Sequence, residues 1–267
     1  MLTIQELSQL KGRRALITGA TGYLGKVIAE TLAELGADLI LVDRPGANFD
    51  SLSADLIQRW GVSVAHRSCD LELQDDRRDL VAWVKGTGVG LNILVNNAAF
   101  VGTSKLDGWA VPFEEQSLEV WRRALEVNLT AIFELCQSLA SDLKQAEGSN
   151  IINIASIYGS YGPDNTLYAG TEMANPAAYA ASKGGLIQLT RWLATTLAPS
   201  TRVNSIAPGG IFRNQPDLFV ERYKAKTPLA RMAEENDIRG AIAYLSSDMA
   251  SYVTGQNLSV DGGWGIW

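Results

Sequence analysis

Thr18-Gly19-Ala20-Thr21-Gly22-Tyr23-Leu24-Gly25 lies between a short apolar run, Arg14–Thr18, and a longer amphipathic stretch, Tyr23–Leu35. The run has the length of a strand, and the stretch has the length of a helix. Glycines at this spacing allow a tight turn and a close approach of the backbone to a pyrophosphate, which the helix N-terminus would bind. The stretch predicts a dinucleotide-binding turn, and a glycine-rich turn without a ligand is the alternative. The expected cofactor contacts are Gly19, Thr21, Gly22, Tyr23, Leu24 and Gly25.

Strand-length apolar runs alternate with helix-length amphipathic stretches along the whole chain. The apolar runs lack an alternation of period two, which is typical of strands buried on both faces. The predicted strands are Arg14–Thr18, Asp38–Val42, Val62–Ala65, Ile93–Val95, Ile151–Ile154, Arg202–Ile206 and Leu258–Val260. The predicted helices are Tyr23–Leu35, Ser51–Trp60, Asp75–Lys85, Leu118–Lys144, Ala177–Leu197 and Glu234–Ser246. This pattern predicts one α/β domain over residues 1–267, with a Rossmann-type doubly wound parallel sheet of about seven strands and helices on both faces.

Two regions, at about residues 157–178 and 208–228, interrupt this alternation. Each follows a predicted strand at its carboxyl end, which is the edge where open α/β sheets bind ligands. Long loops at such an edge are more often functional than structural. We therefore expect both regions to be substrate loops.

Composition and charge argue against several classes of protein. The chain has 267 residues, of which 46% are hydrophobic and 19% are charged, enough for one domain with a sizeable core. Its formal net charge is −6, and it has no run of Lys or Arg that would bind nucleic acid. No stretch reaches the ~18 uninterrupted apolar residues of a membrane helix, and Met1–Gly12 lacks the apolar core of a signal peptide. We expect a cytoplasmic protein with neither nucleic-acid nor membrane partners.

The cysteines and the histidine indicate no metal. The chain has two cysteines, Cys69 and Cys136, and one histidine, His66. The cysteines lie far apart and form no CxxC motif, so the sequence predicts neither a metal site nor a disulfide. Small buried thiols in a reducing compartment explain them better.

Acidic residues follow the second and third predicted strands. Asp43 lies 21 residues after Gly22, close to the ~20 expected for an acid that bonds the adenosine ribose. A carboxylate there repels a 2′-phosphate, so the sequence favours NAD. Arg44 could meet that phosphate, so NADP stays possible. Asp70 is either an adenine contact or a loop or cap acid.

Tyr179 and Lys183 lie one turn apart on one face of the predicted helix Ala177–Leu197. An unperturbed phenol titrates near ~10, too high for a base at neutral pH. A nearby ammonium favours the phenolate and lowers that pKa. The pair therefore predicts a tyrosine that transfers a proton, although such a spacing alone is common by chance.

The chain resembles the short-chain dehydrogenase/reductase family from its first strand to its C-terminus. The family's motifs occur here in order: the glycine-rich turn, Asn96-Asn97-Ala98-Ala99, Asn128 in Val127-Asn128-Leu129, Ser156, Tyr179-x-x-x-Lys183, Pro208-Gly209-Gly210 and Val260-Asp261-Gly262-Gly263. The resemblance implies a Rossmann fold and hydride transfer between a nicotinamide cofactor and a secondary alcohol or ketone. Compact members form homo-oligomers, so a tetramer or a dimer is expected.

The resemblance also implies roles for individual residues. Ser156 would bond the substrate oxygen, and Tyr179 would carry the proton. Lys183 would lower the pKa of Tyr179 and bond the nicotinamide ribose, and Asn128 would hold a water that links Lys183 to solvent. Further cofactor contacts would come from Asp43, Arg44, Asp70, Leu71, Asn97, Ala98, Ala99, Tyr179, Lys183, Pro208, Gly209 and Ile211.

The sequence departs from the family's usual pattern at three places. Compact members read Thr-Gly-x-x-x-Gly-x-Gly, whereas here Gly22 comes one position early and Tyr23 stands at the middle glycine. Ser156 and Tyr179 are 23 residues apart, more than in compact members. Arg213 stands where the family has a Thr that bonds the nicotinamide. That contact would then fall to the Ile211 backbone, and Arg213 would face an anionic group of the substrate.

The polar residues between Ser156 and Tyr179 predict a polyhydroxylated small-molecule substrate, although exposure alone also explains them. Trp109, Phe212 and Trp264 would offer flat faces to a sugar ring, and Arg213 would pair with a phosphate or carboxylate. The expected substrate contacts are Ser156, Phe212, Arg213 and Glu172. The segment 165–183 is also similar to sugar oxidoreductases of bacterial flagellin-glycan synthesis.

Two other functions stay open at this point. One is a 3-oxoacyl carrier-protein reductase, which would be expected to prefer NADPH and to carry a basic patch for its acidic carrier. The other is a nucleotide-binding regulator without turnover, although such proteins have usually lost the Tyr or the Lys. The apolar C-terminus, Trp264–Trp267, is expected to be buried at a subunit contact or over the active site.

Overall fold

Seven strands form one sheet in the order β3-β2-β1-β4-β5-β6-β7. A computed structural model describes residues 1–101 and 106–267. The strands are β1 (Arg14–Thr18), β2 (Asp38–Asp43), β3 (Val64–Ser68), β4 (Ile93–Asn96), β5 (Asn150–Ile154), β6 (Arg202–Pro208) and β7 (Asn257–Val260). Every neighbouring pair is parallel, which confirms the predicted Rossmann-type sheet.

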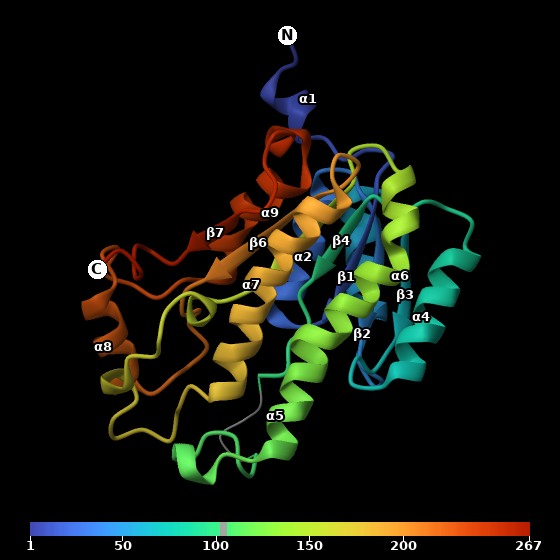
Figure 1. The fold of residues 1–267 in the computed structure, drawn as a ribbon. Helices are drawn as coiled ribbons and strands as arrows, with labels where there is room; N and C mark the ends of the chain where they lie inside the picture. The colour runs from blue at the N-terminus through green and yellow to red at the C-terminus, as the bar shows by residue number, and fades with distance from the viewer. Residues whose placement is uncertain (102–105) are drawn as a thin grey trace.

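Helices cover both faces of this sheet (Figure 1). One layer consists of α2 (Tyr23–Glu34), α3 (Asp50–Trp60) and α9 (Arg239–Ser246). The other consists of α4 (Gln74–Gly86), α6 (Ala131–Gln145) and α7 (Ala177–Leu197). Successive side chains of a strand point to opposite faces, so Ile17 of β1 enters the first core and Leu16 enters the second. Burial on both faces explains why the central strands are continuously apolar.

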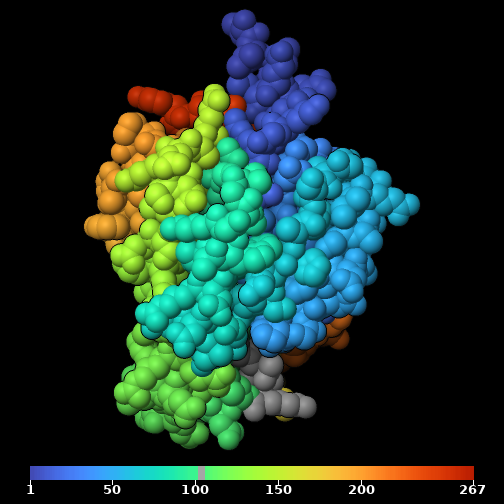
Figure 2. Space-filling view, turned by 90° about the vertical axis from the view of Figure 1, so that its right-hand side faces the viewer, coloured from blue at the N-terminus to red at the C-terminus, as the bar shows by residue number. Residues whose placement is uncertain are grey.

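Three further helices lie outside these two layers. α1 (Ile4–Ser8) begins with a capping box between Thr3 and Glu6 and has no buried residue; it stands out from the body of the molecule (Figures 1 and 2). α5 (Leu118–Leu125) leads into α6, and α8 (Asp217–Lys226) lies beside the C-terminus (Figure 1). None of the helices in the described part of the chain combines the length and the apolar character needed to span a bilayer.

Several elements differ from the predicted ones. β3 lies at Val64–Ser68 instead of Val62–Ala65, and it is partly exposed because it forms an edge of the sheet. The helix predicted at Leu118–Lys144 is interrupted by a π-helical turn, Glu126–Thr130. The helix predicted from Glu234 begins with a 3-10 turn and becomes α-helical at Arg239. The predicted loop 208–228 contains α8.

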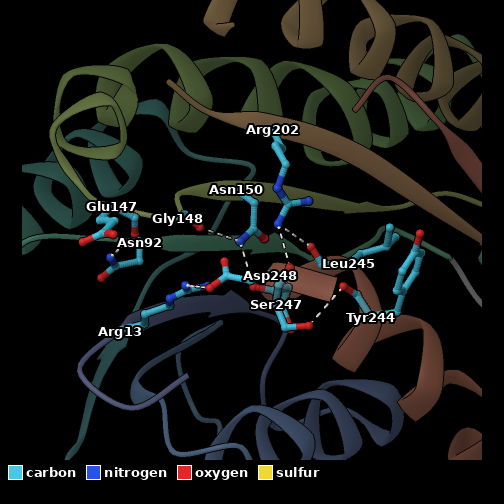
Figure 3. Close-up of polar contacts among 11 residues, drawn as sticks. Arg13, Asn92, Glu147, Gly148, Asn150, Arg202, Tyr244, Leu245, Ser247 and Asp248 are labelled. Carbon is cyan, nitrogen blue, oxygen red and sulfur yellow. Dashed lines mark hydrogen bonds and ion pairs between the residues drawn. The ribbon is translucent and has the colours of Figure 1, made fainter. Parts of the chain in front are cut away.

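The strand order reverses between β1 and β4, and the carboxyl ends of these strands face the site described below. A polar network closes the opposite, amino-terminal edge (Figure 3). Arg202 of β6 donates to the carbonyls of Leu245 and Ser247 at 3.0 and 3.2 Å, and Arg13 pairs with Asp248 at 2.6 Å. These contacts hold the end of α9 against the amino-terminal edge of the sheet. The site described below lies at the carboxyl edge.

Candidate active site

One cavity of about 850 Å³ runs along the carboxyl edge of the sheet. Its wall contains many of the predicted site residues, which come from the whole length of the chain between Gly19 and Arg213. They are Gly19, Gly22, Tyr23, Leu24, Gly25, Asp43, Arg44, Asp70, Leu71, Asn97, Ala98, Ala99, Ser156, Tyr179, Lys183, Pro208, Gly209, Ile211 and Arg213. Thr21 lines a second hollow beside it, shared with Gly22, Asp43 and Arg44.

The glycine-rich turn has no room for a side chain at Gly19 or Gly25. Gly19 has φ +65°, and a Cβ there would lie 2.9 Å from Ala98 Cα. A Cβ on Gly25 would collide with the Gly19 carbonyl oxygen. Gly22 caps α2 with no side-chain hydrogen bond, so the first N–H groups of the helix face the cavity without a competing acceptor. This cradle fits the pyrophosphate of a dinucleotide.

The carboxylate of Asp43 is held in place at the end of β2. Its Oδ2 accepts from the Thr21 backbone N–H at 2.9 Å and from the Thr21 hydroxyl at 2.8 Å. Its Oδ1 accepts from the Arg44 N–H at 2.8 Å. A carboxylate has about four lone-pair sites, so Oδ1 keeps a site that a ribose hydroxyl could use. Arg44 is exposed beside it.

Asp70 lies in the turn after β3, and its expected contact with the adenine stays a prediction. Its Oδ1 accepts from the Glu72 N–H at 3.0 Å, as a loop acid would, and the residue also lines the cavity. Arg77, which the sequence did not single out, holds this turn by donating to the Leu71 carbonyl at 2.6 Å. Arg77 is 2% exposed and pairs with Glu126 at 2.7 Å and Glu134 at 2.6 Å.

Ser156, Tyr179 and Lys183 meet at the other end of the cavity. Ser156 caps the short turn after β5 and accepts from the Tyr158 N–H at 3.2 Å. Tyr179 and Lys183 lie on consecutive turns of α7, with Nζ 5.7 Å from the centre of the phenol ring. Lys183 is 1% exposed, and its Nζ donates to the Ile154 carbonyl at 2.7 Å.

Burial dominates the electrostatics of this pair. It raises the pKa of Tyr179 above its usual value, although the nearby Ser156 hydroxyl and the positive charge of Arg213 act in the opposite direction. Burial also lowers the pKa of Lys183 to about 8. Burial thus outweighs the groups that lower the pKa of Tyr179, and the expected effect of Lys183 on this pKa stays a prediction.

Asn128 lies in the π-helical turn and is fully buried. Its Oδ1 accepts from the Phe100 N–H at 2.6 Å, and its Nδ2 donates to the Phe100 carbonyl and to Ser182 Oγ, both at 3.1 Å. Ser182 in turn donates to the Tyr179 carbonyl at 2.8 Å. The side chain of Asn128 thus joins a cavity wall to the helix that carries Tyr179.

Comparison with known proteins agrees with this geometry. The family model described as enoyl-(acyl carrier protein) reductase matches residues 19–265. A relative, the 3-oxoacyl-[acyl-carrier-protein] reductase FabG of Aquifex aeolicus, is 31% identical over 96% of this chain and 98% of its own length. This chain belongs to the short-chain dehydrogenase/reductase family. It is accordingly an NAD(P)-dependent oxidoreductase that acts on CH–OH groups.

Solved structures of the family share the fold. A short-chain dehydrogenase from Leptospira borgpetersenii with bound NAD⁺ is 30% identical, with a TM-score of 0.83, and the match covers 99% of this chain and 97% of that one. A short-chain dehydrogenase/reductase named glucose/ribitol dehydrogenase, from Brucella melitensis, is 32% identical with a TM-score of 0.81, covering 96% and 98%.

Two of the four expected substrate contacts do not line the cavity. Glu172 and Phe212 are exposed and are absent from its wall. Trp109 packs behind Tyr179 with Phe100, and Trp264 packs against Tyr158 and Tyr223. These rings therefore do not offer the free flat faces expected for a sugar, because they fill apolar clusters.

The insertion between Ser156 and Tyr179 uses much of its polarity internally. Asp164 accepts from the Thr166 N–H at 2.9 Å and pairs with Lys226, and Thr171 donates to the Tyr168 carbonyl at 2.8 Å. The phenols of Tyr158 and Tyr168 bond each other at 2.5 Å. The sequence carries no signal for this pair, because the two residues lie on separate turns.

Proposed function

We propose that this enzyme transfers a hydride between NAD and a secondary alcohol or ketone of a small polar molecule, such as a sugar or sugar derivative. The observation that carries the proposal is a single cavity with Ser156, Tyr179 and Lys183 at one end and Asp43 at the other. When bound, NAD supplies the hydride donor or acceptor, and its oxidised ring is cationic.

The residues of the cavity then have distinct parts in the reaction. Ser156 hydrogen-bonds the substrate oxygen and orients the carbinol carbon. Tyr179 Oη gives a proton to that oxygen in reduction and takes it in oxidation. Lys183 Nζ keeps donors beyond its bond to Ile154, and these bind the nicotinamide ribose. Asn128 positions α7 through Ser182, and it would also hold the water that links Lys183 to solvent.

The fixed carboxylate of Asp43 supports NAD over NADP. Thr21 and Arg44 hold the carboxylate with three hydrogen bonds, so it cannot easily turn away from a 2′-phosphate. Two like charges that are held close together disfavour binding. The exposed guanidinium of Arg44 is the group that would favour NADP.

The sugar-like substrate rests on more limited support. The amide of Gln215, at the cavity wall, is a group that can bond a hydroxyl. The likeness to a protein named glucose/ribitol dehydrogenase supports the same class. The likeness to FabG supports the alternative, a 3-oxoacyl carrier-protein reductase. Arg123, a cation near the cavity, is bound by both oxygens of Glu72 and is therefore not free to hold an acidic carrier.

We also propose that the chain forms a homo-oligomer. Leu118 of α5, Phe133 of α6 and Trp192 of α7 are 69%, 40% and 55% exposed. These side chains lie on helices that contact one another, α5 with α7 and α6 with α7, and exposed apolar side chains on neighbouring elements are typical of an interface. Ile266 and Trp267 at the C-terminus are also exposed, and their burial at a subunit contact or over the active site stays a prediction. Trp264 is buried within the chain.

Fluorescence titrations with NADH and with NADPH test the proposal first. We expect NADH to bind at least tenfold more tightly, and a subsequent screen of polyols with NAD and of acetoacetyl thioesters with NADPH to give turnover with the polyols. Tyr179→Phe should remove most turnover and leave the NADH affinity within about twofold of the wild type, because only the proton carrier is lost. Near-normal turnover of this variant would overturn the assignment of Tyr179.

A further inference from the structure

The structure brings together two side chains that are 190 positions apart in the sequence, Tyr23 and Arg213. The guanidinium carbon of Arg213 lies 4.9 Å from the centre of the Tyr23 ring. Tyr23 is the first residue of α2, directly after the glycine-rich turn, and Arg213 follows β6. Both line the cavity, so the stack spans it from the turn to the segment after β6.

The chain around Arg213 fixes the guanidinium in this position. The Gln215 side chain accepts from the Arg213 N–H at 2.7 Å and donates to the Ile211 carbonyl at 2.8 Å. Asn214 between them has φ +58°, a left-handed conformation that tightens the turn. Arg213 Nε donates to Glu235 Oε1 at 3.0 Å, which turns the side chain toward α2. The group is therefore largely pre-organised.

The cations of the cavity differ in their position and in the groups that they bind. Among the described residues they are Arg44, Arg123, Lys183 and Arg213. Arg44 is exposed beside Asp43, Arg123 is held by Glu72 through two bonds, and the Nζ of Lys183 donates to the Ile154 carbonyl. Arg213 forms an ion pair with Glu235 through its Nε. Arg213 lies beside Tyr23, the first residue of α2, and within residues 1–101 and 106–267 the structure records a partner for its Nε but none for its two Nη groups.

We propose that Arg213 and Tyr23 form a clasp over the dinucleotide, in which the Nη groups of Arg213 bind the pyrophosphate and the Tyr23 ring holds the guanidinium in place. The inference rests on the proposed dinucleotide-binding function. Arg is suited to the task because its planar fork bonds phosphate oxygens while its face stacks on an aromatic ring. The clasp assigns Arg213 to the cofactor instead of to an anionic substrate, because its side chain is directed at α2.

Binding measurements on the whole protein test the clasp. The probes are NADH, ADP-ribose as a competitor that carries the pyrophosphate, and adenosine as a competitor that lacks it. Arg213→Gln should raise the Kd of NADH and of ADP-ribose about tenfold and leave that of adenosine unchanged. The Kd of ADP-ribose should also rise less steeply with salt in this variant than in the wild type. Arg213→Lys keeps the charge but stacks less well on the ring, so its Kd for NADH should lie between those of the wild type and Arg213→Gln.

The ring is tested by a matched pair of variants at position 23. Tyr23→Ala should weaken NADH binding about threefold, and Tyr23→Phe, which keeps the ring, should bind like the wild type. In the double variant with Arg213→Gln, Tyr23→Ala should add little, because the ring acts through the guanidinium.

Different outcomes separate this inference from the proposed function. Unchanged affinity of Arg213→Gln for NADH and ADP-ribose, with a raised KM for the alcohol, would overturn the clasp and return Arg213 to the substrate. Fully additive effects of the two substitutions would overturn the role of Tyr23. If the wild type bound neither NADH nor ADP-ribose, the proposed function would fail together with the clasp.

Discussion

Lys183 shows at the residue scale how function opposes stability. It is 1% exposed, and burial lowers its pKa to about 8. In the unfolded chain a lysine titrates near ~10.4, so the folded state binds this proton less tightly. Below pH 8 the charged form is present in both states and the folded state carries the full penalty, on the order of 3 kcal/mol. Above the unfolded pKa both states are neutral, and the penalty disappears.

Replacement of this lysine should therefore stabilise the protein at neutral pH. We expect Lys183→Met to raise the free energy of unfolding at pH 7 by about 1–3 kcal/mol, less than the full penalty because the Ile154 carbonyl loses its donor. The gain should shrink as the pH rises from about 8 to 10.5, since wild-type stability increases in that window. Urea unfolding at several pH values measures it, with Lys26→Met, an exposed lysine, as control. A gain that is independent of pH would contradict the argument.

The buried phenol of Tyr179 predicts the pH dependence of turnover. Its pKa is raised by burial, so at neutral pH it carries the proton that ketone reduction needs. We expect kcat for reduction to stay constant through neutral pH and to fall only in the alkaline range, while kcat for oxidation climbs with pH. Arg213 lowers this pKa, so Arg213→Gln at saturating cofactor should move the alkaline limb to higher pH. A reductive limb that falls already at pH 7 would disagree.

At the scale of secondary-structure elements, the turn after β3 is connected to α7, the helix that carries Tyr179 and Lys183. Arg77 of α4 bonds the Leu71 carbonyl in the turn and Glu126 at the start of the π-helical turn. That same turn carries Asn128, which bonds Ser182 of α7. π-helical turns are often found at functional sites, and here the turn places Asn128 between the cavity wall and α7. The buried charge of Arg77 is satisfied by two carboxylates, an arrangement that is sensitive to the loss of one partner.

Arg77→Met should destabilise the protein by about 3–5 kcal/mol, because Glu126 and Glu134 are left without their cation. It should also raise the Kd of NADH, because the Leu71 turn loses its support. Thermal or urea unfolding and the NADH titration measure the two effects. The neighbouring Arg78, whose side chain is 64% exposed, serves as control, and Arg78→Met should change stability by less than about 0.5 kcal/mol. Equal effects of the two substitutions would contradict the role of the network.

The sequence predicted the elements whose signals are local. The glycine-rich turn, Asp43 at the end of β2 and the Tyr179–Lys183 pair depend on spacing along one strand, turn or helix, and all of them line one cavity. Contacts between distant segments left no such signal. Arg77 stands in an amphipathic helix like any exposed arginine, and only the fold shows that it is buried.

The same limit applies to the predicted substrate contacts. Trp109 and Glu172 were chosen for their chemistry, and the structure buries the first in an apolar cluster and exposes the second away from the cavity. The direction of a loop side chain depends on the packing of the whole insertion, including the Tyr158–Tyr168 pair. The π-helical turn was also missed, because its sequence continues the helical pattern on both sides.

At the scale of the whole molecule, the two edges of the sheet have different tasks. The amino edge is closed by the Arg13–Asp248 pair and by Arg202, which bonds the end of α9 (Figure 3). The carboxyl edge carries the cavity and the loops that follow the strands, as in other open α/β sheets. The single domain expected over residues 1–267 stays a prediction, and cooperative unfolding monitored by two probes would test it.

The assembly is the last property that the surface predicts. Trp192 on α7 is 55% exposed, and Leu118 and Phe133 on α5 and α6 add to the apolar surface of the same run of helices. We expect light scattering to show a dimer or tetramer and Trp192→Asp to lower the measured mass, because a carboxylate would be desolvated at the contact. Ile57→Asp places the same charge on α3, where Ile57 is 47% exposed, and should leave the mass unchanged. A monomeric wild type would contradict the proposed interface, and so would an oligomer whose mass Trp192→Asp does not change.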